Sequence, residues 1–388
     1  MNYLDKLLEG VDVEWKTLGM VAKVGTGSSN GNEANENGEY PFFVRSQKIK
    51  TKNAYEYNEE AIIIPGEGGI GDIYHYIKGK YALHQRVYRI HFTVDFVDTR
   101  FIYYYMSTHF KGFIMRKAVS ATVTSIRKPM IESFLVPIPP LEIQQKIVAI
   151  LDSFTELIAK LTAELTVRKQ QYTYYREQFF VFDKKKVQHL PMEDESIGVF
   201  QRGKRFVKTD LISEGVPVIH YGEMYTHYGT WAEETKSFLS EELVKSKNLR
   251  VAQQGDVVIV AAGETIEDIG KGTAWLGNEG VVIHDACFSF RTSLNTKFVA
   301  YFTRTKQFHD QIKKHISSGK ISAINAKGLG KAIIPVPSKE VQENIVSILD
   351  KFDILTNSSS EGLPKEIELR KKQYEYYRDL LLTFHKDN

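Results

Sequence analysis

The stretch that begins Pro137-Ile-Pro-Pro-Leu-Glu142 occurs twice and decides the fold. In full it reads Pro137-Ile-Pro-Pro-Leu-Glu-Ile-Gln-Gln-Lys-Ile-Val-Ala-Ile-Leu-Asp-Ser-Phe154, and it returns 198 residues later as Pro335-Val-Pro-Ser-Lys-Glu-Val-Gln-Glu-Asn-Ile-Val-Ser-Ile-Leu-Asp-Lys-Phe352, with ten of eighteen positions identical. A second block, Arg168-Lys-Gln-Gln-Tyr-Thr-Tyr-Tyr-Arg176, is matched 202 residues later by Arg370-Lys-Lys-Gln-Tyr-Glu-Tyr-Tyr-Arg378. Matches of this length indicate that the chain was duplicated.

The segments before these blocks correspond more weakly. Paired stretches are Val24-x-x-Gly27 with Phe200-x-x-Gly203, Tyr40–Phe43 with Val216–Ile219, Ala61–Ile64 with Val257–Val260, His84 with His284, and Ser120–Ile126 with Ser318–Ile324. The apolar positions are kept while the polar residues differ. We interpret this as two domains of one fold that present different surfaces, each followed by a shared structural element.

The variable segments predict an α+β fold. Short β-rich runs broken by glycine occur at residues 61–64, 81–90, 257–260 and 281–290, and helix-like stretches follow at 100–116 and 297–315. This order is typical of an α+β domain with a twisted sheet. We therefore expect a first sheet-bearing domain at 1–136, a helical region at 137–182, a second domain at 183–334 and a second helical region at 335–388.

The repeated blocks predict helices. The prolines forbid a helix before them, and Glu142 and Glu340 favour a helix start just after them. A three–four alternation then follows at Ile158, Leu161, Leu165, Arg168, Tyr172, Tyr175, Phe179 and Phe182, and in the second copy at Ile367, Arg370, Tyr374, Tyr377, Leu381 and Phe384. This is the pattern of a coiled-coil seam. The segment Ser358–Pro364 breaks the second copy into a short helix and a long one.

Connectivity predicts the direction of these helices. The first must end where the second domain begins, and the second leaves that domain, so a packed pair is antiparallel with one domain at each end. A seam of roughly 25 residues spans about 37 Å. That length is close to one turn of B-DNA, about 34–36 Å. Two domains so placed would meet successive major grooves on one side of a duplex.

Composition limits the class of protein. The 388 residues, 42% of them hydrophobic, provide for two or three domain cores. The only cysteine, Cys287, excludes an intrachain disulfide, and although His284 stands near it, no second Cys/His pair offers the four ligands of structural zinc. We expect Cys287 in the core. The N-terminus has no apolar signal region and no apolar stretch is long enough to span a bilayer, so we expect a cytoplasmic protein.

Motifs of catalysis are mostly missing from the sequence. Gly66-Glu-Gly-Gly-Ile-Gly71 has the spacing of a dinucleotide-binding loop, but the residues after it are β-like, so we interpret it as a glycine-rich hairpin. There is no phosphate-binding loop for ATP, no Asn/Asp-Pro-Pro-aromatic tetrapeptide of amino-methyltransferases and no Pro-Asp start of a nuclease carboxylate cluster. His309-Asp310 lies in a helical stretch without partner ligands. We therefore expect no catalytic residues and no metal site in this chain.

Over its whole length the chain resembles the specificity subunits of type I restriction–modification systems. The resemblance rests on Pro137-x-Pro followed by Glu142-x-Gln144-x-x-Ile147-Val148-x-x-Leu151-Asp152, on the copy from Pro335 to Asp350, and on the Gln-Tyr-x-Tyr-Tyr-Arg end of each helix. Phe200-Gln-Arg-Gly203-Lys204 with Val216–Gly222 looks like the start of a target-recognition domain of that family. The two copies differ in one respect: the segment between the two repeated blocks is four residues longer in the second copy.

This resemblance implies a protein that supplies specificity while its partners supply chemistry. Two target-recognition domains would each read one half of a bipartite, asymmetric DNA site, and the helices would fix the gap. The helical regions would dock two adenine-N6 methyltransferase subunits, and restriction subunits would join outside. S-adenosylmethionine, ATP and Mg belong to these partners, so the chain itself is expected to bind no cofactor.

Base-contacting residues vary with the target, so we choose candidates on physical grounds. Arg45, Lys48, Lys50 and Lys52 fall within eight residues that contain no acid, which is a candidate phosphate-binding strip. Polar and basic side chains on loops of the variable domains are the general candidates. They are Arg45, Ser46, Gln47, Lys48, Lys78, Thr122, Thr124 and Arg127 in the first domain, and Arg202, Lys204, Arg205, Tyr221, Lys271, Lys320, Ser322 and Asn325 in the second.

The repeated helical blocks provide the candidates for methyltransferase docking. They are Gln144, Ile147, Leu151 and Tyr172 in the first copy and Gln342, Ile345, Leu349 and Tyr374 in the second. For the apolar members the alternative, that they only hold this chain together, is equally compatible with the sequence. Two other functions also stay open: a stand-alone methyltransferase or nuclease with degenerate motifs, and a DNA-binding regulator outside restriction.

Overall fold

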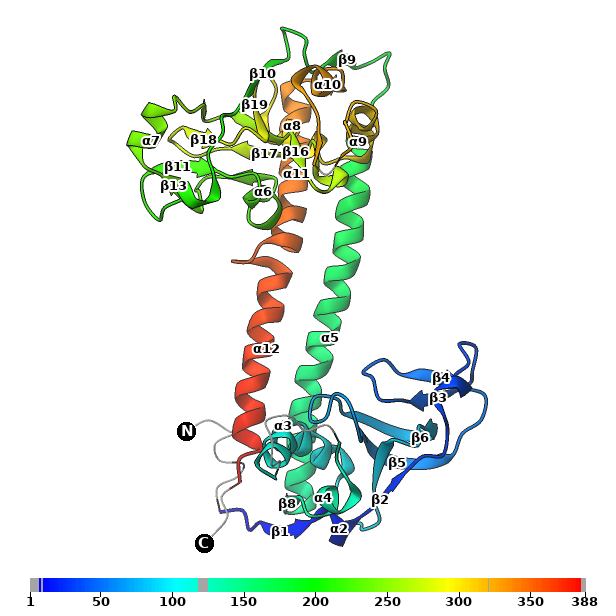
Figure 1. The fold of residues 1–388 in the computed structure, drawn as a ribbon. Coiled ribbons are helices and arrows are strands. Elements are labelled where there is room, and N and C mark those ends of the chain that lie inside the picture. Colours follow the sequence, from blue (N-terminus) through cyan, green and yellow to red (C-terminus); the bar gives the residue numbers. More distant parts are fainter. Residues whose placement is uncertain (1–6, 8–9, 118–124, 320, 385–388) are drawn as a thin grey trace. The chain divides into compact units, whose positions relative to one another are not determined.

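The computed structural model describes residue 7 and residues 10–117, 125–319 and 321–384 (Figure 1). Its contacts divide into two compact units. Unit 1 comprises Met1–Lys160 with Glu368–Asn388, and unit 2 comprises Leu161–Ile367. Each unit therefore combines one variable domain with parts of the repeated helices, and the α+β class is confirmed.

The sheet of unit 1 has six strands in the order β2-β7-β5-β6-β3-β4. Their bounds are β2 Ala22–Thr26, β3 Tyr40–Phe43, β4 Lys50–Lys52, β5 Tyr57–Pro65, β6 His75–Leu83 and β7 Val87–Phe92. Neighbours are antiparallel except β3 and β6, which pair in parallel. The β5 residues Ile62, Ile63 and Ile64 are buried, so this central strand is covered on both faces, as its unbroken apolar run predicts.

Short elements and helices complete unit 1. They are the pair β1 Glu14–Thr17 and β8 Leu135–Ile138, the turn η1 Gly31–Glu33, and the helices α2 Leu18–Val21, α3 Thr99–Lys117 and α4 Lys128–Glu132. One core cluster joins α3 to the sheet and to the repeated helices. Phe101 and Met106 of α3 pack there with Ile147 and Leu151 and with Leu381 near the C-terminus.

Unit 2 repeats this topology with changes. A five-stranded sheet has the order β10-β19-β15-β17-β12, a four-stranded sheet has the order β13-β11-β18-β14, and two pairs are β16-β20 and β21-β9. The bounds are β9 Gln188–Pro191, β10 Gly198–Arg202, β11 Val216–Ile219, β12 Trp231–Ala232, β13 Ser237–Leu239, β14 Val251–Ala252, β15 Asp256–Val260, β16 Ala262–Gly263, β17 Gly272–Trp275, β18 Val281–Ile283, β19 Cys287–Thr292, β20 Ser322–Ala323 and β21 Ile333–Val336.

The order β10-β19-β15-β17 matches β2-β7-β5-β6, which confirms that one fold is present twice. The long strand β6 of unit 1 pairs with β5 and, at its end, with β3. In unit 2 residues 276–280 divide its counterpart into β17, which pairs with β15, and β18, which pairs with β11. The sequence predicted single runs at 81–90 and 281–290. Both are divided by a tight turn, at residues 84–86 and 284–286.

The second helix-like stretch, expected as one helix over 297–315, is two helices. They are α8 Thr296–Phe302 and α9 Lys306–Lys313, and Thr305 between them caps α9 by accepting the backbone N–H of Phe308. The remaining short helices of unit 2 are η2 Lys208–Asp210, α6 Glu223–Thr226, α7 Glu241–Ser246, η3 Ile266–Asp268 and α10 Ala326–Gly330.

The repeated blocks form helices, as the sequence predicts. The first copy is one continuous helix, α5 Leu141–Gln178, and the second is divided into α11 Lys339–Asn357 and α12 Gly362–Leu381, of nearly equal length rather than short and long. In unit 1 Phe154 of α5 stacks on Tyr377 of α12 at 5.6 Å, and in unit 2 Tyr175 of α5 stacks on Phe352 of α11 at 5.6 Å. Within each unit the paired helices run in opposite directions (Figure 1).

Along α5 the residues at 158, 161, 165, 168 and 172 are less exposed than their neighbours, which agrees with the predicted seam. Among the described helices, none combines the length and the apolar content that crossing a membrane would require.

Candidate nucleic-acid interface

Three separate segments of the first domain meet at one edge. The guanidinium of Arg45, after β3, forms an ion pair of 3.2 Å with Glu67 of the glycine-rich loop. The same loop receives a hydrogen bond of 2.9 Å from the backbone N–H of Ile126 to the carbonyl of Gly66, next to Arg127. The loop joins β5 to the antiparallel β6, so the hairpin prediction is confirmed. The segments chosen at 45–48 and at Arg127 therefore belong to one surface, which we call the first basic edge.

Charge at the first basic edge is positive on balance. Arg86 also binds Glu67, at 2.8 Å, and the hydrogen bond from Arg86 holds the pKa of that carboxyl below its ordinary value. One carboxylate thus serves two guanidiniums. Within the described ranges Arg127 and Lys48 have no acidic partner within 4 Å. Unneutralised cations on loops are what a polyanion attracts.

The second domain has a cleft of about 730 Å³ at the equivalent place. The predicted residues Arg202, Arg205 and Tyr221 line it, together with Lys208 and Glu264. The strand β16 and Ile321, which precedes β20, line its other side, and β16 pairs with β20 through Gly263 and Ser322. In the first domain Glu67 pairs with Ser125 in the same manner, so the two sites occupy the same position in the repeated fold.

Aromatic rings form the floor of this cleft. His284 contacts the rings of Phe206, His220 and Tyr221 at centroid distances of 4.9, 4.9 and 5.0 Å. The Nε2 of His284 lies 3.0 Å from the carbonyl of Phe206, and its Nδ1 accepts the backbone N–H of Ala286 at 3.1 Å. Burial lowers the pKa of His284, although the nearby carboxylate of Asp285 acts in the opposite direction. Burial thus favours the neutral ring, in which the Nε2–H donates to the Phe206 carbonyl and Nδ1 accepts the Ala286 N–H.

The same turn exists in the first domain. Nδ1 of His84 accepts the backbone N–H of Arg86 at 3.0 Å. The chain packs closely against both turns through glycine: a Cβ on Gly27 would lie 1.8 Å from the carbonyl oxygen of Leu83, and one on Gly203 would lie 2.1 Å from that of His284. These contacts explain why the His and Gly positions match between the copies while their neighbours differ.

The cations of the cleft are available for a ligand. The Nε of Arg202 donates to the backbone carbonyl of Asp285 at 2.9 Å, which fixes its side chain without neutralising it. In the part of the chain that the structure describes, neither Arg205 nor Lys208 forms an ion pair, and both are exposed. The carboxylates of Glu264 and Asp268 also line the cleft, and Asp268 pairs with Lys271. Donors and acceptors thus stand side by side.

The remaining predicted DNA contacts are placed differently. Lys78 lies on β6 and faces Glu60 at 3.6 Å, and Gln47 lines a second cavity, of about 430 Å³. The hydroxyl of Ser46 donates to the carbonyl of Lys48 within its own turn. Thr122, Thr124 and Lys320 lie outside the described residues, and Lys204 lies beside the cleft without lining it.

Two chosen residues serve the fold instead of a surface. Ser322 is buried in β20, and Asn325 caps α10 by accepting the backbone N–H of Gly328 at 2.8 Å. Sequence reasoning missed Arg86, Lys208 and Glu264. Two of these could have been found in the sequence. Arg86 stands two positions after His84, which is matched in both copies, and Lys208 stands three positions after the basic residues at 202–205.

The residues chosen for methyltransferase docking are mostly inside this chain. Ile147, Leu151, Leu349 and Gln144 are fully buried, and Gln342, Ile345 and Tyr172 nearly so, while Tyr374 is half-buried beside the second cavity. Buried side chains offer no surface to a partner. For the apolar members, burial agrees with the alternative that the sequence left open, namely that they hold this chain together.

The predicted core position of Cys287 is confirmed, because its side chain is buried in β19 and burial raises the pKa of its thiol to about 12. Over the described residues no group of three or more His, Cys, Asp or Glu side chains is placed to hold a metal ion.

Two copies of one α+β domain, each with basic side chains beside the same His turn, define a protein with two recognition domains. Comparison with known families agrees with this class. The model of the type I restriction modification DNA specificity domain matches residues 10–167 and 194–369, and the chain belongs to this family.

Individual relatives share the whole length of the chain. The specificity subunit of the type I restriction enzyme EcoR124I/EcoR124II from Escherichia coli is 29% identical, with 100% of this chain and 98% of the relative covered. A putative type I restriction enzyme specificity subunit from Haemophilus influenzae is also 29% identical, with 99% and 98% covered. Both are named as specificity subunits, which agrees with the expectation of a chain without catalysis of its own.

Solved structures confirm the fold. The S subunit of a type I restriction–modification system from M. genitalium superposes with a TM-score of 0.59 at 16% identity, covering 100% of both chains. A structure from work on complex assembly and conformational transition of the type I R-M system gives a TM-score of 0.59 at 14% identity, with 95% and 97% covered.

Proposed function

We propose that this chain binds double-stranded DNA sequence-specifically and that its two domains read the two unlike halves of a bipartite site. The observation that carries the proposal is the repeated edge. Both domains place basic side chains beside the same His turn, but on different segments. In the first domain they are Arg45 after β3 and Arg86 in the turn itself. In the second they are Arg202 at the end of β10 and Arg205 and Lys208 after it. One frame with two sets of contact residues fits a site whose halves differ in sequence.

In this proposal, methylation and cleavage of DNA are carried out by partner subunits. Two adenine-N6 methyltransferase subunits, which use S-adenosylmethionine, would dock on the helical regions, and restriction subunits with ATP and Mg would join them in the cytoplasm. Support for docking comes from exposed apolar residues that recur in both copies. Val167 and Tyr174 of α5 are 49% and 60% exposed, and their counterparts Leu369 and Tyr376 of α12 are 48% and 61% exposed. Exposed apolar residues repeated at matching positions are typical of an interaction surface.

The test of DNA recognition uses the full chain with its methyltransferase partner. The probe is a duplex that carries the site mapped from N6-methyladenine positions in host DNA. Arg205→Ala should weaken binding about ten-fold or less and reduce the slope of log affinity against log salt by about one, because one phosphate contact is lost. Arg45→Ala should act likewise from the first domain. Fluorescence anisotropy at several salt concentrations measures both quantities.

The matched control is Lys245→Ala, which removes an exposed cation of α7 that does not line the cleft. Its salt slope should equal that of the unaltered chain. Equal slopes for Arg205→Ala and the unaltered chain would remove the cleft from the interface. Methylation of DNA by the purified chain alone would instead favour a stand-alone enzyme.

A further inference from the structure

The same polar junction joins helix to recognition domain in both units. In unit 1 the Nε2 of Gln144 donates to the carbonyl of Pro139 at 2.8 Å, and its Oε1 accepts the backbone N–H of Asp98 at 2.8 Å. In unit 2 Gln342 donates to Pro337 at 2.9 Å and accepts from Asn295 at 2.8 Å. Each carboxamide therefore ties the start of a repeated helix to the residue that precedes α3 or α8.

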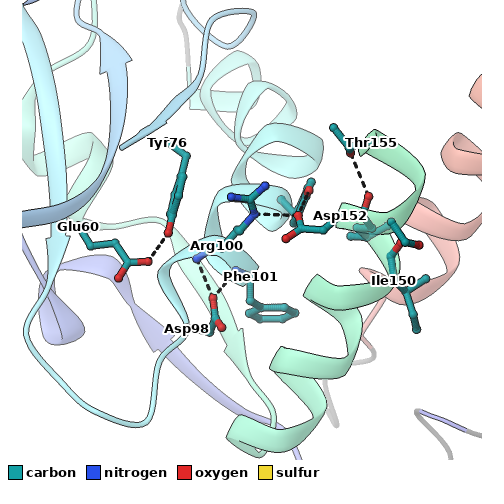
Figure 2. A network of polar contacts seen from close by, with 11 residues as sticks. Glu60, Tyr76, Asp98, Arg100, Phe101, Ile150, Asp152 and Thr155 are labelled. Atoms are coloured by element: carbon teal, nitrogen blue, oxygen red, sulfur yellow. Dashed lines mark hydrogen bonds and ion pairs between the residues drawn. The ribbon is translucent and has the colours of Figure 1, made fainter. Parts of the chain in front are cut away.

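A carboxylate just over two turns further along the helix makes a second connection in unit 1 (Figure 2). Asp152 of α5 accepts hydrogen bonds from the Nε of Arg100, at 2.7 Å, and from the hydroxyl of Tyr104, both on α3. The guanidinium of Arg100 also lies over the ring of Tyr76 at 4.9 Å, and the hydroxyl of Tyr76 donates to Glu60. This chain of contacts runs from the repeated helix to the strands β6 and β5.

Unit 2 contains the corresponding connection with different residues. Asp350 of α11 accepts from the ammonium of Lys297 at 2.9 Å and from the hydroxyl of Tyr301 at 2.7 Å, both on α8. The ammonium of Lys297 lies 4.1 Å from the ring centroid of Trp231 on β12. The pattern of carboxylate, tyrosine, cation and aromatic ring is thus kept, although Arg is replaced by Lys and Tyr by Trp.

These connections are built to resist rotation. Each aspartate binds two donors that lie one helical turn apart on the domain helix, and the ion pairs are about three-quarters buried, with exposed side-chain fractions of 37% and 27% for Arg100 and Asp152 and 20% and 22% for Lys297 and Asp350. Burial raises the pKa of Tyr104 and of Tyr301, so both hydroxyls stay protonated donors. A charge-assisted bond is shorter and stronger than a neutral one, and two of them fix an angle as well as a distance.

We propose that Asp152 and Asp350 are positioning residues that hold each recognition domain in one orientation on its helix and thereby restrict the spacer length between the two half-sites. The inference rests on the proposed function, since it assumes that the two domains read one bipartite site. Apolar packing alone would allow small rotations of a domain about the helix, because dispersion contacts are not directional. The polar connection removes that freedom without touching DNA.

The experiment measures binding to a set of duplexes that carry the mapped half-sites with the native spacer or with one base pair added or removed. The unaltered chain, in complex with its methyltransferase, should bind the native spacer best. Asp152→Asn and Asp350→Asn should reduce the preference for the native spacer over the altered ones about ten-fold, the equivalent of one charge-assisted hydrogen bond. The preference for the correct bases within each half-site should not change.

Conservative variants separate positioning from folding. Arg100→Lys keeps the ion pair in the form that unit 2 already uses, so it should keep the sharp spacer preference. Glu156→Gln, on an exposed face of α5 one turn beyond Asp152, should also keep it. If Asp152→Asn does not fold, Arg100→Gln is tested in its place. This variant removes the ion pair, while Asp152 still accepts the hydrogen bond from the hydroxyl of Tyr104.

Two outcomes would overturn the inference. A spacer preference as sharp in Asp152→Asn, Asp350→Asn and Arg100→Gln as in the unaltered chain would show that the connection has only a structural role. Loss of half-site discrimination together with spacer preference would show a general loss of structure. Failure of the unaltered chain to select any mapped duplex would instead overturn the proposed function itself.

Discussion

Among single residues, His284 is the one whose protonation we expect to affect stability most directly. It is 8% exposed, three aromatic rings surround it, and its Nδ1 accepts a backbone N–H, so protonation would break a hydrogen bond and bury a charge. The carboxylate of Asp285, 3.0 Å from the same nitrogen, opposes this effect in part. Its pKa lies below the ordinary value of 6.5, first because of burial. The unfolded chain therefore takes up a proton that the folded chain does not.

This linkage gives a pH prediction. The contribution of His284 to stability should be constant above about pH 7 and should fall as the pH drops below about 6.5 toward its lowered pKa, because protons then favour the unfolded state. His284→Asn, which keeps an oxygen acceptor for the Ala286 N–H and cannot titrate in this range, should show a smaller fall. Thermal midpoints from pH 8 to pH 5 measure the effect.

His227→Asn, at an exposed position, is the control for this prediction and should leave the acid-induced fall unchanged. A fall of equal size in His284→Asn and in the unaltered chain would mean that other groups cause it.

Gln144 and Gln342, predicted as docking residues, make their contacts inside the chain. Their side chains look like polar groups on a helix surface in sequence, yet each binds two backbone groups inside its unit. A glutamine that repeats at the same position of two copies indicates a shared contact. The sequence does not say whether that contact lies within the chain or outside it.

At the scale of elements, four residues distinguish the two helical copies. The offset between the repeated blocks grows from 198 to 202 residues, and residues 358–361, between α11 and α12, are the four that are not helical. Ser358 supports this break by accepting the backbone N–H groups of Ser360 and Glu361. Gly362 then starts α12 with φ of 77°, in the left-handed region.

Alanine substitution at Gly362, which follows the break, and at Gly112, inside α3, should have opposite effects on stability. A Cβ on Gly362 would lie 2.4 Å from the carbonyl oxygen of Ile354, so Gly362→Ala should destabilise unit 2 by about 1 kcal/mol or more. Gly112 lies inside α3 and its added Cβ would meet nothing closer than 3.6 Å, so Gly112→Ala should stabilise unit 1 by about 0.5–1 kcal/mol.

Urea unfolding monitored by hydrogen exchange resolves the two units and measures both changes. A stabilising effect of Gly362→Ala would show that the strained turn is not retained in solution.

Insertions also explain the differences between the sheets. Between β3 and β5 the first domain has only the short strand β4, whereas between β11 and β15 the second has α6, β12, β13, α7 and β14. The added strands extend both sheets of unit 2 at their edges, and the shared central strands keep their order. Edge positions tolerate additions because they disturb no existing strand pair on the other side.

At the scale of the whole molecule, duplication predicts two equivalent docking surfaces. Val167 and Tyr174 on α5 and Leu369 and Tyr376 on α12 are exposed at matching positions, seven residues apart in each copy, so each pair shares one helix face. If each face binds one methyltransferase subunit, Tyr174→Asp should remove one subunit from the complex and Tyr376→Asp the other. The double variant should bind none, because a carboxylate in an apolar contact has no partner.

Mass photometry of the co-purified complexes counts the bound subunits. Glu164→Gln, a nearby exposed change, should leave two bound. Full occupancy in the double variant would place docking elsewhere on the chain.

Much of this architecture follows from the sequence. The duplication, the α+β class, the helical blocks and the glycine-rich hairpin were all predicted, since periodicity and repeated apolar positions are local signals. The basic edges were predicted in part, because loops rich in Arg and Lys are visible as clusters. The sequence did not show whether a given polar residue faces outward. Ser322, Gln342 and Arg205 are all polar, but Ser322 and Gln342 are buried whereas Arg205 is exposed.

The sequence by itself determined that one domain occurs twice and that helices follow each copy, because identical spacing of apolar residues requires the same pattern of burial. Tertiary structure alone decided that the turns of His84 and His284 lie beside the first basic edge and the cleft, and that Asp152 and Asp350 connect helix to domain. These pairs bring together residues about 50 positions or more apart in the chain, such as Arg100 with Asp152 and Phe206 with His284. Contacts over such separations depend on how the elements pack, and no local pattern of residues encodes that packing.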